Sequence, residues 1–311
     1  MTLAQEIKQQ SCQLGFDLVG ITDAEAVSES HIRFFTDWLS RGYASQMDYM
    51  HRNLEKRINP SKLLPGAKSV IVVGLNYTPE KTNSNKQKQP FAAGRVANFA
   101  RYEDYHLFIK KQLRKLVAFI VERVAPGVQF KMCVDAEPIA ERAVAAKAGL
   151  GFIGKNHMLI NPQFGCQILL GEIITSLELQ YDKPLKGDCS NCGKCVQACP
   201  TGALRSDGQF DANLCISYLT IEHKGQIPPD LAKKIGDRIF GCDECVLACL
   251  WQKNAPPCKN KEFKFCADRA ELNLKEILSL TQWDFDERFA GTCLARLGLE
   301  NLKRNARICL G

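Results

Sequence analysis

The chain has 311 residues, of which 45% are hydrophobic and 24% are charged, a composition typical of a soluble globular protein with a substantial core. No apolar run approaches the roughly 20 residues that cross a bilayer, which argues against a helical membrane protein. The formal net charge of +7 arises from 41 basic and 34 acidic residues and is too small to establish a polyanionic partner.

The first 180 residues carry the alternating helix and strand patterns of an α/β domain. Helical patterns cover 2–15 and 31–42, and the apolar run 69–77 predicts a buried strand. The next segment, 79–94, is polar and rich in Lys, Asn and Pro, so we expect a mobile loop there.

A second group of elements follows this loop. The pattern predicts a long helix at 104–124, a strand at 127–134, a helix at 137–148 and a strand at 166–175. Asp135 then lies at the end of a strand, where ligands bind in α/β domains. From position alone, a role as helix N-cap explains Asp135 equally well.

Gly149, Gly151 and Gly154 match the dinucleotide-binding pattern G-x-G-x-x-G. That pattern binds pyrophosphate where it leaves a strand and opens a helix. Here it follows a predicted helix, so we expect the glycines to end that helix and turn the chain. They would also let the backbone approach another large cofactor closely.

Eight of the fifteen cysteines fall between residues 189 and 249. In a C-x2-C-x2-C-x3-C-P run, the fourth cysteine ligates the other of two 4Fe–4S clusters. The spacing therefore predicts cluster I on Cys189, Cys192, Cys195 and Cys249, and cluster II on Cys199, Cys215, Cys242 and Cys245. Because these ligands occupy every iron, the clusters carry electrons and the reaction needs a separate site.

Zinc and disulfides are the alternatives for these cysteines. Zinc sites use cysteine pairs separated by a loop, which is not this pattern. The first residues, MTLAQEIKQQ, show neither a basic-then-apolar signal nor a twin arginine, so we expect a reducing cytoplasmic location. The other seven cysteines lack ligand spacing and are expected to be small buried apolar residues.

Three parts are expected along the chain. Residues 1–180 form the first domain, 181–255 form the two-cluster domain, and 256–311 form a helical segment that packs on the body. Within the last part, helices are expected at 271–279 and 292–310.

Several motifs beyond the cysteines resemble the epoxyqueuosine reductase family, and the resemblance covers nearly the whole chain. The motifs are Asp135-x-x-Pro-x-x-Glu141-Arg142, Ala148 to Asn156, Cys215-Ile-Ser-Tyr-Leu-Thr-Ile-Glu-His223, Arg304-Asn305-Ala306, Leu64 to Val70, and Asp104-Tyr-His106.

The resemblance implies a mixed fold, α/β or α+β. It consists of an N-terminal nitroreductase-like cobalamin-binding domain, a two-cluster bacterial ferredoxin-like domain, and C-terminal helices. Family members reduce epoxyqueuosine to queuosine at the tRNA wobble position, removing the epoxide oxygen as water with two electrons and two protons. A cytoplasmic, monomeric enzyme is expected, which binds the tRNA anticodon stem-loop and receives electrons from a flavodoxin or ferredoxin.

The resemblance also implies roles for particular residues. Asp135 matches the family's proposed proton donor. Cobalamin is expected base-off and without a protein axial ligand, in keeping with the absence of an Asp-x-His-x-x-Gly signature at Asp104–Ile109. Cobalamin contacts are expected from Arg57, Asn98, Asp135, Lys155, Asn156, Ser217, Gly241 and Cys242. Contacts with tRNA are expected from Tyr218, Glu222, His223 and Lys224.

Two other functions stay open from the sequence. One is a different corrinoid iron–sulfur reductase of the reductive dehalogenase kind, which is usually exported with a twin-arginine signal. The other is a two-cluster electron-transfer protein with no activity of its own, which would give the first 180 residues no function.

Overall fold

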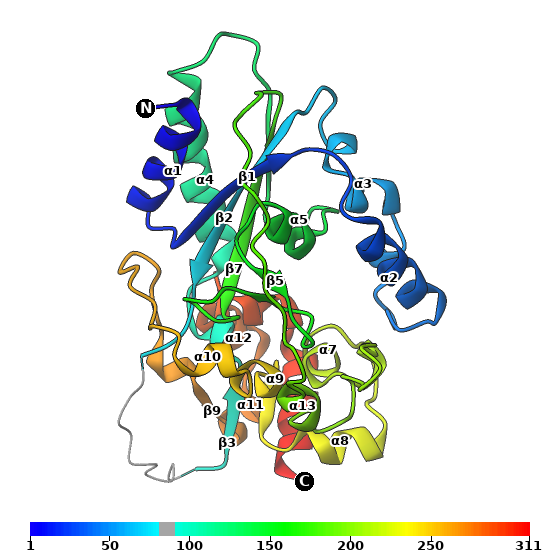
Figure 1. Ribbon diagram of the computed structural model, residues 1–311. Helices are drawn as coiled ribbons and strands as arrows, with labels where there is room; N and C mark the ends of the chain where they lie inside the picture. Colours follow the sequence, from blue (N-terminus) through cyan, green and yellow to red (C-terminus); the bar gives the residue numbers. More distant parts are fainter. Residues whose placement is uncertain (81–90) are drawn as a thin grey trace.

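The computed structural model describes residues 1–80 and 91–311 (Figure 1). A sheet with helices on its faces occupies the upper part of Figure 1, and the cysteine-rich segments and the C-terminal helices occupy the lower part. None of the described helices is long and apolar enough to cross a membrane.

Four strands form the central sheet in the order β1-β2-β7-β4. Their bounds are β1 Leu18–Asp23, β2 Ser69–Asn76, β7 Ile168–Thr175 and β4 Phe130–Cys133. Every pairing between them is antiparallel, so the α/β prediction for this region is wrong and its α+β alternative applies. Every residue of β2 and β7 is buried, which explains the mainly apolar sequence of both strands, and Glu172 of β7 is a buried exception.

Helices cover both faces of this sheet. Helices α1 (Leu3–Gln13) and α4 (Tyr105–Val121) share a hydrophobic core with one face, which includes Ile71 of β2. Helix α5 (Glu141–Lys147) packs on the opposite face, which includes Val70. The alternation of neighbouring β2 residues between the two cores follows from the two-residue period of a strand.

The predicted long helices correspond to α1, α2 and α4, with ends that differ by at most three residues from the predicted ones. Helix α2 spans Glu29–Ser40, and the short elements of this part of the chain are η1 Asp48–Met50, α3 Leu54–Ile58, η2 Pro60–Lys62, η3 Asn98–Arg101, β5 Phe152–Ile153 and β6 Leu159–Ile160. In the expected loop 79–94, residues 81–90 lie outside the described part of the chain, and its last two residues belong to strand β3 (Ala93–Val96), which was not predicted.

The turn before α5 differs from its prediction. The helix begins at Glu141 rather than near Pro138, because the Glu137 and Glu141 side chains hold the preceding backbone. The Val134 N–H donates to Glu137 Oε2 at 2.9 Å, and the Asp135 N–H donates to Glu141 Oε1 at 2.6 Å. After α5, Gly149 has φ +82°, so the glycines end the helix as expected.

A second sheet joins the three parts of the chain. β3 pairs in parallel with β8 (Arg238–Phe240) and antiparallel with β9 (Glu271–Asn273). The cysteine-rich part otherwise contains short helices, at α6 Lys194–Gln197, η4 Ala212–Leu214, α7 Ile216–Ile221, α8 Pro229–Ile235, α9 Glu244–Leu247 and α10 Leu250–Lys253. Residues from all three predicted parts therefore share one sheet.

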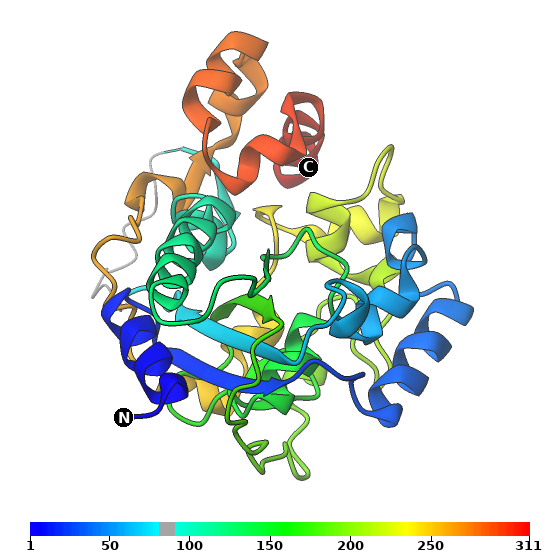
Figure 2. The same cartoon turned by 90° about the horizontal axis from the view of Figure 1, so that it is seen from above.

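The C-terminal segment is helical, with more elements than expected. They are η5 Ala267–Arg269, α11 Leu274–Ser279, α12 Gln282–Phe289, η6 Cys293–Leu297 and α13 Leu299–Leu310. These helices, orange to red in Figure 2, lie beside the N-terminal end of α4, where Arg296 contacts His106. The helix expected at 271–279 begins as strand β9, because its first residues pair with β3.

The seven cysteines outside the cluster pattern are not all buried. Cys133, Cys166 and Cys293 are buried, as expected. Cys12 is exposed, and Cys258, Cys266 and Cys309 are partly exposed, so the expectation is wrong for these four.

Candidate active site

A cavity of about 590 Å³ lies where the central sheet meets the cysteine-rich part. One side is apolar and includes Ile168, Leu169 and Leu170 of β7. Asp135, from the turn before α5, also lines the cavity. Such a largely apolar cavity with few polar groups is typical of a cofactor site.

The structure divides the eight predicted cluster cysteines between two cavities. Cys199, Cys215, Cys242 and Cys245 line the large cavity. Cys189, Cys192, Cys195 and Cys249 line a second cavity of about 420 Å³. Each cavity therefore has cysteines from both the 189–199 run and the 242–249 run, as the predicted cluster ligation requires.

The surroundings of these thiols suit a bound cation. Burial raises the pKa of Cys242 to about 11 and raises that of Cys245 further. At Cys199, burial also raises the pKa, but hydrogen bonds from the backbone of Leu204, Ala203 and Thr201 outweigh it and lower the pKa. Cys242 and Cys245 can therefore be thiolates only beside a cation such as iron. Backbone N–H donors already face the sulfur of Cys199, which is predicted to ligate the same cluster.

Asp135 is held in an unusual backbone conformation, with φ +59°. Its side chain is 44% exposed, and Oδ2 lies 2.9 Å from His106 Nε2 and 3.6 Å from Arg296 Nη1. Burial would raise the pKa of Asp135, but the hydrogen bond and charge of His106, with the charge of Arg296, hold it below its ordinary value. Without a ligand, Asp135 is therefore an ionised carboxylate facing the cavity.

His106 lies between two carboxylates. Its Nδ1 is 2.6 Å from Asp104 Oδ1, and its Nε2 faces Asp135. Burial would lower the pKa of His106, but Asp104 and Asp135 raise it to about 11. Ligand atoms of Asp104, His106 and Cys293 lie within 4.8 Å of one another, so the Cys293 thiol also faces this group.

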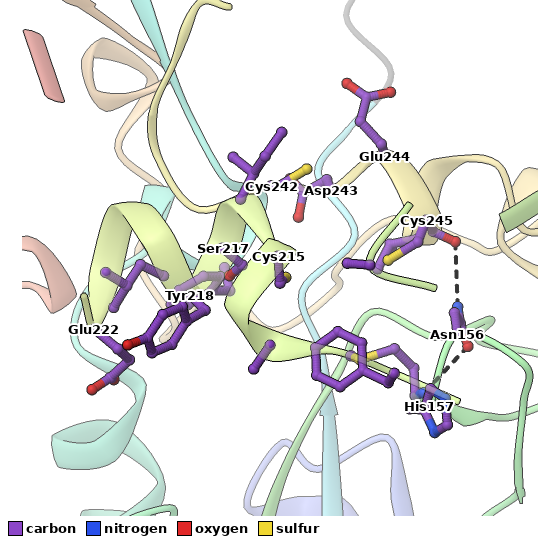
Figure 3. A pocket seen from close by; sticks show the side chains of 18 of the residues that line it. Asn156, His157, Cys215, Ser217, Tyr218, Glu222, Cys242, Asp243, Glu244 and Cys245 are labelled. Atoms are coloured by element: carbon purple, nitrogen blue, oxygen red, sulfur yellow. Dashed lines mark hydrogen bonds between the residues drawn. The ribbon is translucent and has the colours of Figure 1, made fainter. Parts of the chain in front are cut away.

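The residues expected to bind cobalamin do not all reach the large cavity. Asp135, Asn156, Ser217 and Cys242 line it. Asn156 also lines the smaller cavity, and its Nδ2 donates to the Cys245 carbonyl at 3.3 Å, as Figure 3 shows.

The other four expected contacts lie outside the lining of the large cavity. Lys155 lines the smaller cavity, where its Nζ donates to the Ser190 carbonyl at 2.8 Å. The buried Asn98 donates its backbone N–H to Asp243 Oδ2 at 2.7 Å. Gly241, with φ +72°, donates its N–H to a threonine hydroxyl. Among the described residues, Arg57 Nε is buried and has no hydrogen-bond partner.

The residues expected to contact tRNA also separate into two groups. Tyr218 and Glu222 lie on and just after α7 and line the large cavity (Figure 3). Tyr218 is buried, and its hydroxyl accepts the Gln46 N–H at 3.2 Å, which gives it a structural role. His223 and Lys224 are not part of the lining; His223 Nε2 faces the Gln226 carbonyl at 3.0 Å.

Sequence reasoning did not single out His106 or Arg296 for the site. Asp104-Tyr-His106 had a visible signal as a motif, but His106 is 29 positions from Asp135 and only the fold brings them together. Arg296 is 190 positions from His106 and belongs to no motif.

Two family models match the chain. Residues 57–136 match the model described as "Epoxyqueuosine reductase QueG, DUF1730". Residues 188–252 match the model described as "4Fe-4S double cluster binding domain", which supports iron–sulfur ligation by this part of the chain.

Full-length relatives match as well. The epoxyqueuosine reductase of Vibrio cholerae serotype O1 is 36% identical over 312 residues, or 99% of this chain and 83% of the relative. A crystal structure of epoxyqueuosine reductase with an epoxyqueuosine-modified tRNA-Tyr stem loop has TM-score 0.92 and 32% identity, covering 99% of this chain and 80% of that one. A Bacillus subtilis epoxyqueuosine reductase, whose catalytic aspartate loop is swung out of the active site, has TM-score 0.91 and 31% identity, covering 99% and 81%.

Proposed function

The chain belongs to the epoxyqueuosine reductase family, and we propose that it reduces epoxyqueuosine to queuosine at the wobble position of tRNA. The observation that carries this proposal is the large cavity, which has Asp135 on its lining together with four cysteines of one predicted cluster. A proton source and an electron source thus face one space. The test is conversion of epoxyqueuosine to queuosine in tRNA by the reduced protein.

We propose that the large cavity holds cobalamin in its base-off form. Its volume of about 590 Å³ and its apolar side suit a large flat ring. Two histidines are among the described residues that line it. His106 faces carboxylates at both nitrogens, and the His157 ring stacks on Phe34 and has no hydrogen-bond partner among the described residues at its buried Nε2.

The cofactors and the protein would divide the reaction between them. Bound cobalamin would supply strongly reduced cobalt, and the two 4Fe–4S clusters would supply its electrons. An epoxide oxygen leaves only when it is protonated, so a general acid must face the substrate. Asp135 is suited to that role because its half-exposed carboxylate faces the cavity and contacts the protonated His106. Two electrons and two protons convert the epoxide to an alkene and water.

Cluster II would be the cluster next to cobalamin, since its four cysteines line the large cavity. Cluster I would receive electrons from outside. Leu250 and Trp251 line the cavity of cluster I and are 48% and 38% exposed. The exposed Lys155 lines the same cavity, and the exposed Lys194 precedes Cys195. An apolar patch with lysines suits a small acidic carrier of the flavodoxin or ferredoxin kind.

The substrate would be the anticodon stem-loop, with its wobble nucleotide splayed out into the cavity. The net charge of +7 favours phosphate contacts that position this loop. The exposed Arg296 is a candidate contact because it lines the cavity at the surface. We also propose that the protein is monomeric and cytoplasmic and that its domains span residues 1–180, 181–255 and 256–311.

Neither alternative function has a supporting observation. An electron-transfer protein without activity of its own needs no cavity that joins cluster ligands to Asp135. The visible spectrum of cobalamin-loaded protein tests the cofactor assignment. A base-off spectrum is expected, and a lack of binding or a histidine-ligated spectrum would contradict it.

A further inference from the structure

One ring nitrogen of His106 contacts a single carboxylate, and the other has two alternative hydrogen-bond partners. Asp104, the N-cap of α4, accepts hydrogen bonds from the His106 backbone N–H at 2.9 Å and faces Nδ1 at 2.6 Å. This double contact fixes the ring and keeps a proton on Nδ1. The other nitrogen, Nε2, faces Asp135 Oδ2 at 2.9 Å and Arg296 Nη1 at 3.0 Å.

These two partners of Nε2 suit different protonation states. An ionised Asp135 carboxylate can only accept, so it pairs with Nε2 when that nitrogen carries a proton. The Arg296 guanidinium can only donate, so it pairs with Nε2 when that nitrogen has lost its proton. His106 therefore has a hydrogen-bond partner before and after it gives a proton away.

We propose that His106 is the proton reservoir that recharges Asp135, with Asp104 orienting the ring and Arg296 taking over Nε2 after the transfer. This inference rests on the proposed function. Each of the two protons leaves His106 Nε2, joins Asp135 Oδ2 and then passes to the epoxide oxygen, while two electrons that the clusters would supply allow both C–O bonds to break and water to leave. His106 is left neutral, with its Nδ1–H on Asp104, and regains a proton from solvent.

The other groups around His106 agree with this assignment. The neighbouring Tyr105 ring stacks on the imidazole at 3.9 Å, and burial raises the pKa of Tyr105 well above its usual value, so it keeps its proton. Cys293 of η6 also faces the ring and favours the charged form. With the pKa of His106 raised to about 11 and that of Asp135 lowered, the shared proton rests on His106 between turnovers.

The test compares His106→Gln with wild-type holoenzyme in single turnover across pH 6 to 9. A glutamine preserves polar contact but stores no proton, so the maximal single-turnover rate should fall roughly 100-fold while the half-saturating tRNA concentration stays within about twofold. The wild-type rate should stay flat over this range. The variant rate should fall with rising pH, because Asp135 must then be protonated directly from solvent. His51→Gln, at an exposed histidine, is the matched control and should keep the wild-type profile.

A second measurement does not depend on turnover. Nitrogen NMR of histidine-labelled holoenzyme should show His106 with protons on both ring nitrogens at pH 8, and Asp104→Asn should lower its pKa. Equal pH profiles for wild type and His106→Gln would overturn the proposal. A neutral ring at pH 8, or a divalent metal bound by Asp104, His106 and Cys293, would also overturn it. If wild type converts no substrate, the proposed function fails, while the NMR result still reports on His106.

Discussion

The Asp135 backbone N–H and the Glu141 carboxylate form a hydrogen bond, with 2.6 Å between Asp135 N and Glu141 Oε1. The positive φ of Asp135 costs a residue with a Cβ on the order of 1 kcal/mol, and this bond helps offset that cost. Glu137 holds the neighbouring Val134 N–H in the same way. Two carboxylates thus fix the turn that presents Asp135 to the cavity.

The burial of Glu141 beside Asp135 predicts a pH dependence of stability, although the hydrogen bond from the Asp135 N–H opposes it. Burial, followed by the charge of Asp135, raises the pKa of Glu141 to about 7. The stability contributed by neutral Glu141 is therefore fully present below its unfolded pKa and is lost as pH rises through about 7. Relative to Glu141→Gln, wild type should lose on the order of 2 kcal/mol of unfolding free energy between pH 5 and pH 8. Denaturant unfolding at both pH values measures it, and equal losses in the two proteins would contradict it.

The crossed cluster ligation predicts which cysteine variants behave alike. Cys189→Ala and Cys249→Ala should each lose about half of the iron and retain the same cluster, namely cluster II. Cys199→Ala and Cys242→Ala should both retain cluster I. Iron analysis and electron paramagnetic resonance of the reduced proteins distinguish the clusters. If Cys199→Ala instead matches Cys189→Ala, each run ligates its own cluster and the crossed pairing is wrong.

A charge on the cluster I surface should slow electron input. Leu250→Glu should reduce the rate of cluster reduction by an acidic flavodoxin roughly tenfold, because like charges oppose association. Leu310→Glu, at a 41% exposed leucine of α13, is the matched control and should react at the wild-type rate. Reduction by dithionite should be unchanged in both. An unaffected flavodoxin rate in Leu250→Glu would place the donor elsewhere.

Asn305 of α13 should be important for stability rather than for chemistry. It is fully buried, and its Nδ2 donates to the Thr220 carbonyl at 2.8 Å and to the Ile239 carbonyl at 3.0 Å. Asn305→Leu leaves both carbonyls without this donor and should cost roughly 3 kcal/mol in denaturant unfolding. Asn301→Leu, which loses one contact to Leu297 at a partly exposed position, should cost less than about 1 kcal/mol. Equal losses of unfolding free energy in Asn305→Leu and Asn301→Leu would contradict this stabilising role of Asn305.

The sequence predicts elements whose environment is uniform along their length. β2 and β7 are buried at every residue, so both sequences are mainly apolar. The sequence does not predict β1, whose short segment is only half buried, or the joining of β3, β8 and β9. Strand direction depends on which distant strands pair, which explains why the α/β prediction was wrong.

The residues of the candidate site also divide into those that the sequence identifies and those that only the fold brings together. The cluster cysteines were identifiable because iron–sulfur ligation imposes fixed spacing within the chain. Asp135 was identifiable from its motif, but its partners His106 and Arg296 come from other elements and no spacing rule connects them. His223 and Lys224 adjoin the cavity residue Glu222 in sequence, yet neither lines the cavity, because the chain turns away after α7.

The decisive measurement is nucleoside mass spectrometry of tRNA that carries epoxyqueuosine, after incubation with reduced, cobalamin-loaded protein. Wild type should convert epoxyqueuosine to queuosine. Asp135→Asn should bind cobalamin and both clusters normally but convert at least 100-fold more slowly, because an amide cannot deliver the proton. Absence of queuosine with wild-type protein that holds intact clusters and bound cobalamin would contradict the proposed function. Full activity of Asp135→Asn would contradict the role of Asp135 alone.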